Sequence, residues 1–231
     1  MPSKRSLIAL SLLAAFVTTA CSPHVQAQQP PKQKPQAQPP LASFASQRII
    51  LLPVQMLRAD SGSFVTKAMW AEFRKTLDDS VATEISDRGI GKGWGYPADV
   101  LRQAKRNAAY VGDPYALGAQ PLRGQLYKPN DHIPDVMLNN LRGLIALGDT
   151  RYALVPIELV IQRDGPRQRA VLRLALIDGR LGTFMWVGEV VSDPMTALTP
   201  ALINSLAARV GRRMRAASAS KSRHWLAPLR T

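Results

Sequence analysis

Apolar residues in the second half of the chain alternate with polar ones, a pattern typical of strands that bury one face. Three such runs cover Ala153 to Ile161, Ala170 to Leu176 and Phe184 to Val190. Short turns separate them, the first at Asp164-Gly165-Pro166 and the second from Asp178 to Gly182. Alternating runs joined by short turns predict an antiparallel meander.

Four other segments carry apolar residues three or four positions apart, which indicates helices with one buried face. The first spans Thr66 to Arg88 and is followed by Gly89, a residue type that often ends helices. The others begin at Pro97, at Pro134 and at Thr199-Pro200. Proline fits the first turn of a helix because the amide it lacks has no intrahelical partner there.

One further apolar run, Arg48 to Val54, is suited to a buried strand that is ended or edged by Pro53. The element order is then β-α-α-α-β-β-β-α, which predicts a single α+β domain over residues 46–215. We expect a mostly antiparallel sheet of about four strands with helices packed on it. Residues 108–133 show no clear period, and long irregular segments of this kind often carry binding sites.

The amino terminus has the features of a signal peptide. Lys4 and Arg5 precede an uncharged, mostly apolar run of 14 residues from Leu7 to Ala20. That length suits the apolar region of a signal peptide and falls short of the about 20 residues that a membrane-spanning helix needs. Cys21, the only cysteine of the chain, follows directly.

The stretch Val17-Thr18-Thr19-Ala20-Cys21 resembles the lipobox of bacterial lipoproteins, in which a small residue precedes a cysteine that is lipidated and becomes the new N-terminus. Thr18 departs from the Leu that the family usually has at this position. The resemblance implies a signal peptide of residues 1–20, palmitate on Cys21 and attachment of the chain to a membrane through that lipid.

Two neighbouring residues bear on this interpretation. Ser22, rather than Asp, follows the cysteine, and in the sorting rule that this resembles, that favours the outer membrane, with the domain facing the periplasm. The alternative is an ordinary secretory peptide that is cleaved after Ala27.

Residues 21–45 comprise the lipidated cysteine and a segment rich in proline and glutamine. The 24 residues after Cys21 contain six prolines and six glutamines and show no apolar period. Such a composition cannot bury enough surface to offset the entropy lost on ordering. We expect a disordered, extended tether between the membrane and the domain.

The formal net charge of +14 is unevenly distributed along the chain. Residues 46–193 hold 19 basic and 16 acidic side chains, whereas residues 194–231 hold seven basic side chains and no acidic one. A nearly balanced domain with a basic end differs from a uniformly basic protein. We therefore predict no nucleic-acid partner.

The basic end divides into a helical run and a flexible tail at 216–231. The run consists of Arg209, Arg212, Arg213 and Arg215. It is a candidate contact for an anionic cell-wall polymer or membrane surface. The alternative is a solvated helix end, where cations are favourable in any case.

The residue types that hold metals and cofactors are scarce. One cysteine excludes an internal disulfide and any site built from several thiolates. His24, His132 and His224 are too few to favour a histidine cluster. Residues 89–95 are rich in glycine, but they follow a helix, and Gly93 stands where a phosphate-binding loop has Ser or Thr after its lysine. We predict no metal and no cofactor.

Candidate catalytic groups are weak. Asp78 and Asp79 are adjacent on a helix and so point about 100° apart, which does not direct both carboxylates at one substrate. Asp131-His132 lies in the irregular segment with no assignable nucleophile, and no Gly-x-Ser-x-Gly turn is present. A hydrolase using Asp131-His132 is the weakest of the functional alternatives.

Aromatic residues gather between positions 94 and 127. They are Trp94, Tyr96, Tyr110, Tyr115 and Tyr127. One interpretation is that they cover the core. The other is a contact surface for a protein partner, because Tyr and Trp dominate interface hot spots. The candidate partner contacts are Trp94, Tyr96, Tyr110 and Tyr127.

The segment from Ile177 to Gly188 reads hydrophobic-Asp-x-x-x-Gly-x-x-x-Trp-x-Gly, with Asp178, Gly182 and Trp186 at the named positions. It resembles a hairpin of bacterial envelope lipoprotein domains. These include the lipoprotein activators of penicillin-binding proteins, the amino-terminal domain of the Tol-system translocation protein and curli-secretion-type lipoproteins. The resemblance covers roughly residues 48–212 and implies the fold. It carries over no functional residue, because Asp178 and Gly182 shape a turn and Trp186 fills the core.

Together these features predict a non-enzymatic, lipid-anchored periplasmic protein that binds an envelope protein in assembly or regulation. The first alternative is a module that binds an anionic surface through its basic C-terminal run.

Overall fold

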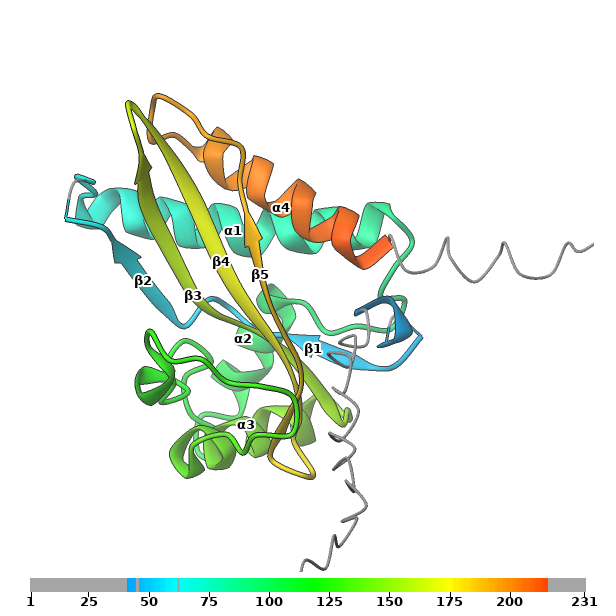
Figure 1. Cartoon of the computed structure of the whole chain (residues 1–231). Helices are drawn as coiled ribbons and strands as arrows, with labels where there is room; N and C mark the ends of the chain where they lie inside the picture. Colours follow the sequence, from blue (N-terminus) through cyan, green and yellow to red (C-terminus); the bar gives the residue numbers. More distant parts are fainter. Residues whose placement is uncertain (1–40, 45, 62, 216–231) are drawn as a thin grey trace, which may run out of the picture. The chain divides into compact units, whose positions relative to one another are not determined.

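The computed structural model describes residues 41–44, 46–61 and 63–215, and Figure 1 labels its elements. The helices are α1 (Lys67–Asp87), α2 (Pro97–Arg106), α3 (Asp135–Leu147) and α4 (Pro200–Arg215), with short 3-10 turns η1 (Leu41–Phe44) and η2 (Gln120–Leu122). The strands are β1 (Ile49–Leu51), β2 (Met56–Ala59), β3 (Tyr152–Asp164), β4 (Arg167–Asp178) and β5 (Thr183–Val191). The predicted α+β class is confirmed. The predicted signal peptide, Cys21, the predicted tether up to residue 40 and the predicted tail at 216–231 lie outside the described residues.

The sheet differs from the prediction in two ways. It is mixed, because β3, β4 and β5 form the predicted antiparallel meander while β1 and β2 both run parallel to β3. It also has five strands, because a further short strand, β2, follows the run at 48–54 for which one strand was expected. The parallel pairing follows from the three helices between β2 and β3, which return the chain to the same end of the sheet.

Two prolines explain why regular pairing with β3 is interrupted between β1 and β2. Pro53 lies between β1 and β2, and Pro156 lies opposite in β3, where the register with β4 shifts between Pro156 and Glu158. Proline has no N–H to donate to a strand ladder, so regular pairing is interrupted there. Single bonds still bridge the gap, from Leu52 N to Leu154 O and from Gln55 N to Pro156 O, each 3.0 Å long.

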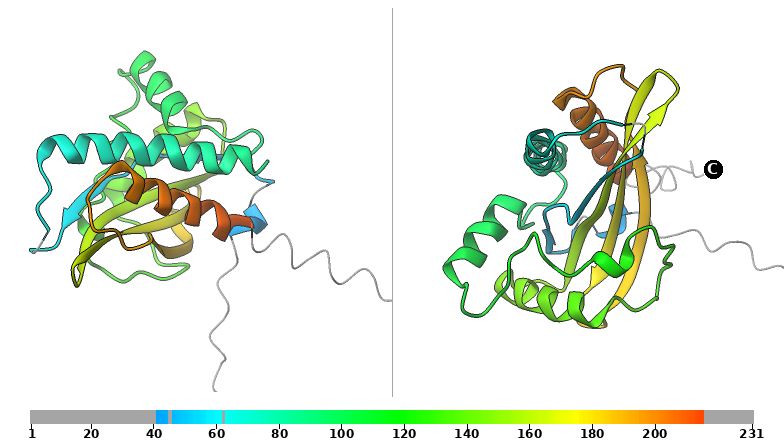
Figure 2. Two further views of the ribbon diagram at one scale, coloured as in Figure 1. Left: turned by 90° about the horizontal axis from the view of Figure 1, so that it is seen from above. Right: turned by 90° about the vertical axis from the view of Figure 1, so that its left-hand side faces the viewer.

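Each face of the sheet is covered by helices. On one face α1 and α4 lie side by side, as Figure 2 shows, and Phe73, Leu77 and Leu206 pack against alternate residues of β3 and β4. On the other face α2 and α3 pack against the remaining residues at one end of the strands, with Met137 and Leu141 fully buried. These two cores account for the apolar periods of the sequence.

The β4–β5 hairpin confirms the structural roles expected for its motif. Asp178 is completely buried, and its Oδ1 accepts hydrogen bonds from the backbone N–H groups of Arg180 (2.9 Å) and Leu181 (3.1 Å). Gly182 has φ +69°, a conformation that favours glycine. Trp186 is 4% exposed and belongs to the core on the α1 and α4 side.

Gly188 completes the motif because the Trp186 indole lies over its α-carbon. A Cβ at position 188 would lie 2.3 Å from Cζ2 of Trp186. An added methyl group must therefore displace a buried ring, and overpacking of this kind costs about 1–3 kcal/mol.

We predict that Gly188→Ala lowers the free energy of unfolding by about 1–3 kcal/mol. The matched control is Gly112→Ala, because the nearest atom to a Cβ at position 112 is 3.9 Å away, so that variant should be as stable as the wild type or slightly more stable. Urea unfolding followed by circular dichroism measures both. Equal midpoints for the two variants would show that the indole moves aside without cost.

Candidate functional site

Buried polar side chains attach the irregular segment 108–133 to the rest of the domain. The side chain of Gln55, 8% exposed, donates from Nε2 to the carbonyl oxygens of Pro53 (2.7 Å) and Pro114 (2.9 Å). Its Oε1 accepts a hydrogen bond from the backbone N–H of Leu117 at 3.0 Å. A buried amide that is fully bonded fixes its partners in one arrangement. The break between β1 and β2 therefore holds residues 114–117 in place.

Asp78 of α1 adds a second attachment at the same point. Its Oδ1 accepts from the backbone N–H of Val54 (3.3 Å), and its Oδ2 accepts from the Tyr115 hydroxyl (3.0 Å). Burial raises the pKa of the Asp78 carboxyl to about 7, although these two hydrogen bonds lower it. The guanidinium of Arg74 lies 4.9 Å from the centre of the Tyr115 ring and also lowers the pKa of Asp78. Asp79, by contrast, is exposed, so the two carboxylates diverge.

An apolar groove lies beside this attachment, between α2 and residues 108–114. It has a volume of about 500 Å³. Its apolar lining comes from Leu101, Ala104, Ala108, Val111 and Pro114, and Lys105 and Asp113 are its charged residues. α3 packs against the groove residue Val111. The contact is close, because a Cβ at Gly143 would lie 2.9 Å from Cγ1 of Val111. Tyr110 in the same loop is 86% exposed.

The structure places the four candidate aromatic contacts in different environments. Trp94 is 8% exposed and packs in the core on the α1 and α4 side, and Tyr96 is half-buried against the same core. Tyr127 is half-buried against the other core, where its ring stacks on Phe184 at a centroid distance of 4.5 Å. Of the four, Tyr110 alone presents most of its ring to solvent.

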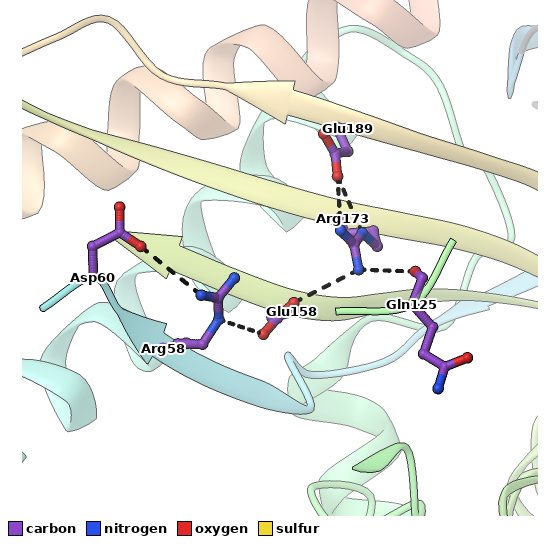
Figure 3. Close-up of polar contacts among 6 residues, drawn as sticks. All are labelled: Arg58, Asp60, Gln125, Glu158, Arg173 and Glu189. Atoms are coloured by element: carbon purple, nitrogen blue, oxygen red, sulfur yellow. Dashed lines mark hydrogen bonds and ion pairs between the residues drawn. The ribbon is translucent and has the colours of Figure 1, made fainter. Parts of the chain in front are cut away.

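A network of charged side chains lies on the sheet face opposite α1 and α4, as Figure 3 shows. Glu158 is 1% exposed, and its carboxylate contacts Arg58 at 3.0 Å and Arg173 at 3.7 Å. Arg173 also contacts Glu189 at 3.0 Å and donates to the carbonyl oxygen of Gln125 at 3.3 Å. Two cations beside one buried carboxylate offset its loss of solvation. The network therefore fixes the second half of the irregular segment to the sheet.

The candidate anion-binding run on α4 is partly engaged by the domain itself. Arg209 forms an ion pair with Asp193, and Arg213 donates to the backbone oxygen of Glu189. Arg212 is exposed, and the side chain of Arg215 lies outside the described residues. Two of the four arginines thus hold α4 to the end of β5 and the segment after it.

The residues considered for catalysis have local structural contacts. The Asp131 carboxylate accepts a hydrogen bond from Lys128 N at 2.7 Å, which closes a turn, and His132 is exposed. The glycine-rich segment runs along β1, where Gly95 exchanges two backbone hydrogen bonds of 2.9 and 2.8 Å with Ile49 and Leu51.

Within the ranges given above, no group of three or more His, Cys, Asp and Glu side chains is placed to hold a metal ion. No helix in this part of the chain is both long enough and apolar enough to cross a membrane.

No protein-family model and no curated protein matches this sequence. Three similar solved structures come from bacteria. A lipoprotein from Neisseria meningitidis is 12% identical with a TM-score of 0.39, over 74% of this chain and 99% of that one. The C-terminal domain of LpoB from Salmonella enterica is 17% identical with a TM-score of 0.35, and the match covers 67% of this chain and 93% of that one. A PelC dodecamer from Paraburkholderia phytofirmans is 12% identical with a TM-score of 0.34, and the match covers 73% of this chain and 86% of that one.

The raised pKa of Asp78 makes stability depend on pH. Because the folded protein keeps a proton that the unfolded chain loses above its usual pKa of 3.8, stability falls as the pH rises from about 4 to about 7. We predict that Asp78→Asn removes this contribution. The stability of the variant relative to the wild type should then rise by up to about 1.4 kcal/mol per pH unit in that window.

Urea unfolding at several pH values between 4 and 8 measures the effect, and Asp79→Asn is the control because that neighbouring side chain is exposed. The same pH profile for Asp78→Asn and the wild type would contradict the assignment.

Proposed function

We propose that this chain is a lipid-anchored protein of the bacterial envelope, attached to the outer membrane through Cys21, whose periplasmic domain acts by binding an envelope protein rather than by catalysis. The lipobox-like sequence before Cys21 and the Pro/Gln-rich segment after it support the anchor and the tether. The irregular segment with its groove supports the binding of a partner.

The observation that carries the proposal is an exposed aromatic ring beside an apolar groove. Tyr110 is 86% exposed and lies in the loop whose residues Ala108 and Val111 line a cavity of about 500 Å³ with a largely apolar lining. Tyrosine beside a concave apolar site is typical of interface hot spots. The polar attachments at Gln55 and Asp78 keep the groove preformed, which lowers the entropy lost on binding.

The charged residues of the groove indicate what the partner presents. Lys105 and Asp113 carry opposite charges within the lining, whereas Arg102 and Arg106 line a different cavity. A largely apolar lining with balanced charge favours a partner segment that inserts an apolar side chain. The basic run on α4 supports a surface-binding role less well, since Arg209 and Arg213 already contact the domain.

We predict that Cys21→Ala abolishes palmitate labelling and moves the protein from the membrane to the soluble fraction of cells, because its acyl chains supply the anchor. The control is Ala27→Arg, which blocks cleavage at the alternative signal-peptide site and should leave lipidation intact. Continued labelling of the Cys21→Ala protein, or a wild-type protein that is soluble and becomes membrane-bound only with Ala27→Arg, contradicts the anchor.

We predict that a photo-crosslinking phenylalanine analogue at position 110 captures a specific envelope protein in living cells. The same analogue at Phe64 is the matched control, because that ring is 82% exposed in the loop between β2 and α1. Ala108→Arg should fill the groove and reduce crosslinking at position 110 without lowering the urea midpoint. Equal products at both positions, or none at position 110, would rule out the groove as the contact.

A further inference from the structure

Three arginines from three different elements line one cavity at the end of the sheet where the chain enters β1. Arg142 belongs to α3, Arg151 directly precedes β3, and Arg180 lies in the turn between β4 and β5. The cavity has a volume of about 350 Å³. Its remaining lining comes from Ile145, Ala146, Thr150 and Gly179. A second cavity of about 380 Å³ shares Thr150, Arg151 and Arg180 with it.

The positive charge of this cavity is only partly compensated. Arg151 is paired with Asp178, with Nε and Nη2 at 2.7 and 2.5 Å from Oδ2. All 16 acidic residues of the chain lie between Asp60 and Asp193. Among the described residues, which include these acids, none brings a carboxylate oxygen within 4.0 Å of Arg142 or Arg180. The cavity therefore has two guanidinium groups in excess over its carboxylates.

Asp178 connects two of the three arginines. The fully buried Asp178 orients the Arg151 guanidinium through Oδ2 and accepts from the backbone N–H of Arg180 through Oδ1. The Arg151 guanidinium also lies 5.2 Å from the centre of the Tyr152 ring. One buried carboxylate thus sets both the direction of Arg151 and the path of the turn that carries Arg180.

Close contact between this turn and α3 brings the third arginine to the cavity. A Cβ at Gly179 would lie 2.1 Å from Cδ1 of Ile145, so the turn packs directly on the helix only because position 179 is glycine. Arg142 is one turn before Ile145 on the same helix, and both line the cavity. The packing of Ile145 on Gly179 thus brings the elements that carry the three arginines to the lining of one cavity.

From this geometry we propose that the cavity binds a phosphate group, carried by a lipid headgroup or by a small soluble phosphate ester. Guanidinium groups bind phosphate through paired charge-assisted hydrogen bonds. A lipid headgroup is a possible source because Gln47 and Arg48, which lie between the expected tether and β1, line the adjoining cavity. This site is separate from the groove at Tyr110 and does not depend on its partner.

The experiment uses the full mature chain with Cys21→Ala, so that a lipid anchor cannot cause vesicle binding. Inorganic pyrophosphate is titrated by calorimetry, and cosedimentation is measured with phosphatidylglycerol vesicles and with neutral phosphatidylcholine vesicles. The test variant is Arg142→Ala/Arg180→Ala. The matched control is Arg163→Ala/Arg167→Ala, which removes the same charge from exposed positions at the far end of β3 and β4.

We expect the test variant to lose at least about tenfold in affinity for the probe that binds, because it lacks two guanidinium groups that donate charge-assisted hydrogen bonds to phosphate. The control variant should bind like the wild type, and both should unfold at similar urea concentrations. Binding of pyrophosphate without vesicles identifies a soluble ligand, and binding of anionic but not neutral vesicles identifies a headgroup. Equal losses in both double variants, or no binding of either probe by the wild type, would overturn the proposal.

Discussion

Pro53 cannot donate a backbone hydrogen bond, and the strand that begins at Ile49 therefore breaks inside the core. The next residue, Val54, is fully buried, so its N–H needs a partner other than water. Asp78 supplies that partner, and Gln55 turns its side chain to the backbone of Pro53 and of the irregular segment. The need to satisfy buried amides at one break thus brings together α1, the first two strands and residues 114–117.

This constraint makes a long irregular segment behave as part of a rigid domain. Its first half is held by Gln55 and Asp78, and its second half by Arg173 and by backbone bonds from Asn130 to Phe184 (2.7 Å) and from Ile133 to Gly182 (2.9 Å). The stretch around Tyr110 lies before these attachments, beside the groove. An exposed ring on a fixed base is a suitable binding element, because little motion must be lost when a partner binds.

Local periodicity was sufficient to predict the four helices and the β3–β4–β5 meander. It could not predict β2, nor the parallel pairing of β1 and β2 with β3, since their partners lie about 100 residues later in the chain. The sites were harder still. Gln55 resembles an ordinary polar residue, and the arginines of the cavity are far apart in sequence. Trp94 and Tyr110 are both aromatic residues of the same segment, and the sequence does not show that one is buried in the core and the other is exposed.

One turn of α3 supports both proposed sites. Gly143 contacts Val111 of the groove, while Arg142 and Ile145 line the arginine cavity. In genetic terms this turn is pleiotropic: a substitution that shifts it disturbs the groove and the cavity together. A loss-of-function allele mapping to residues 142–145 therefore cannot be assigned to either site from its phenotype alone, whereas alleles at Tyr110 or Arg180 separate the two.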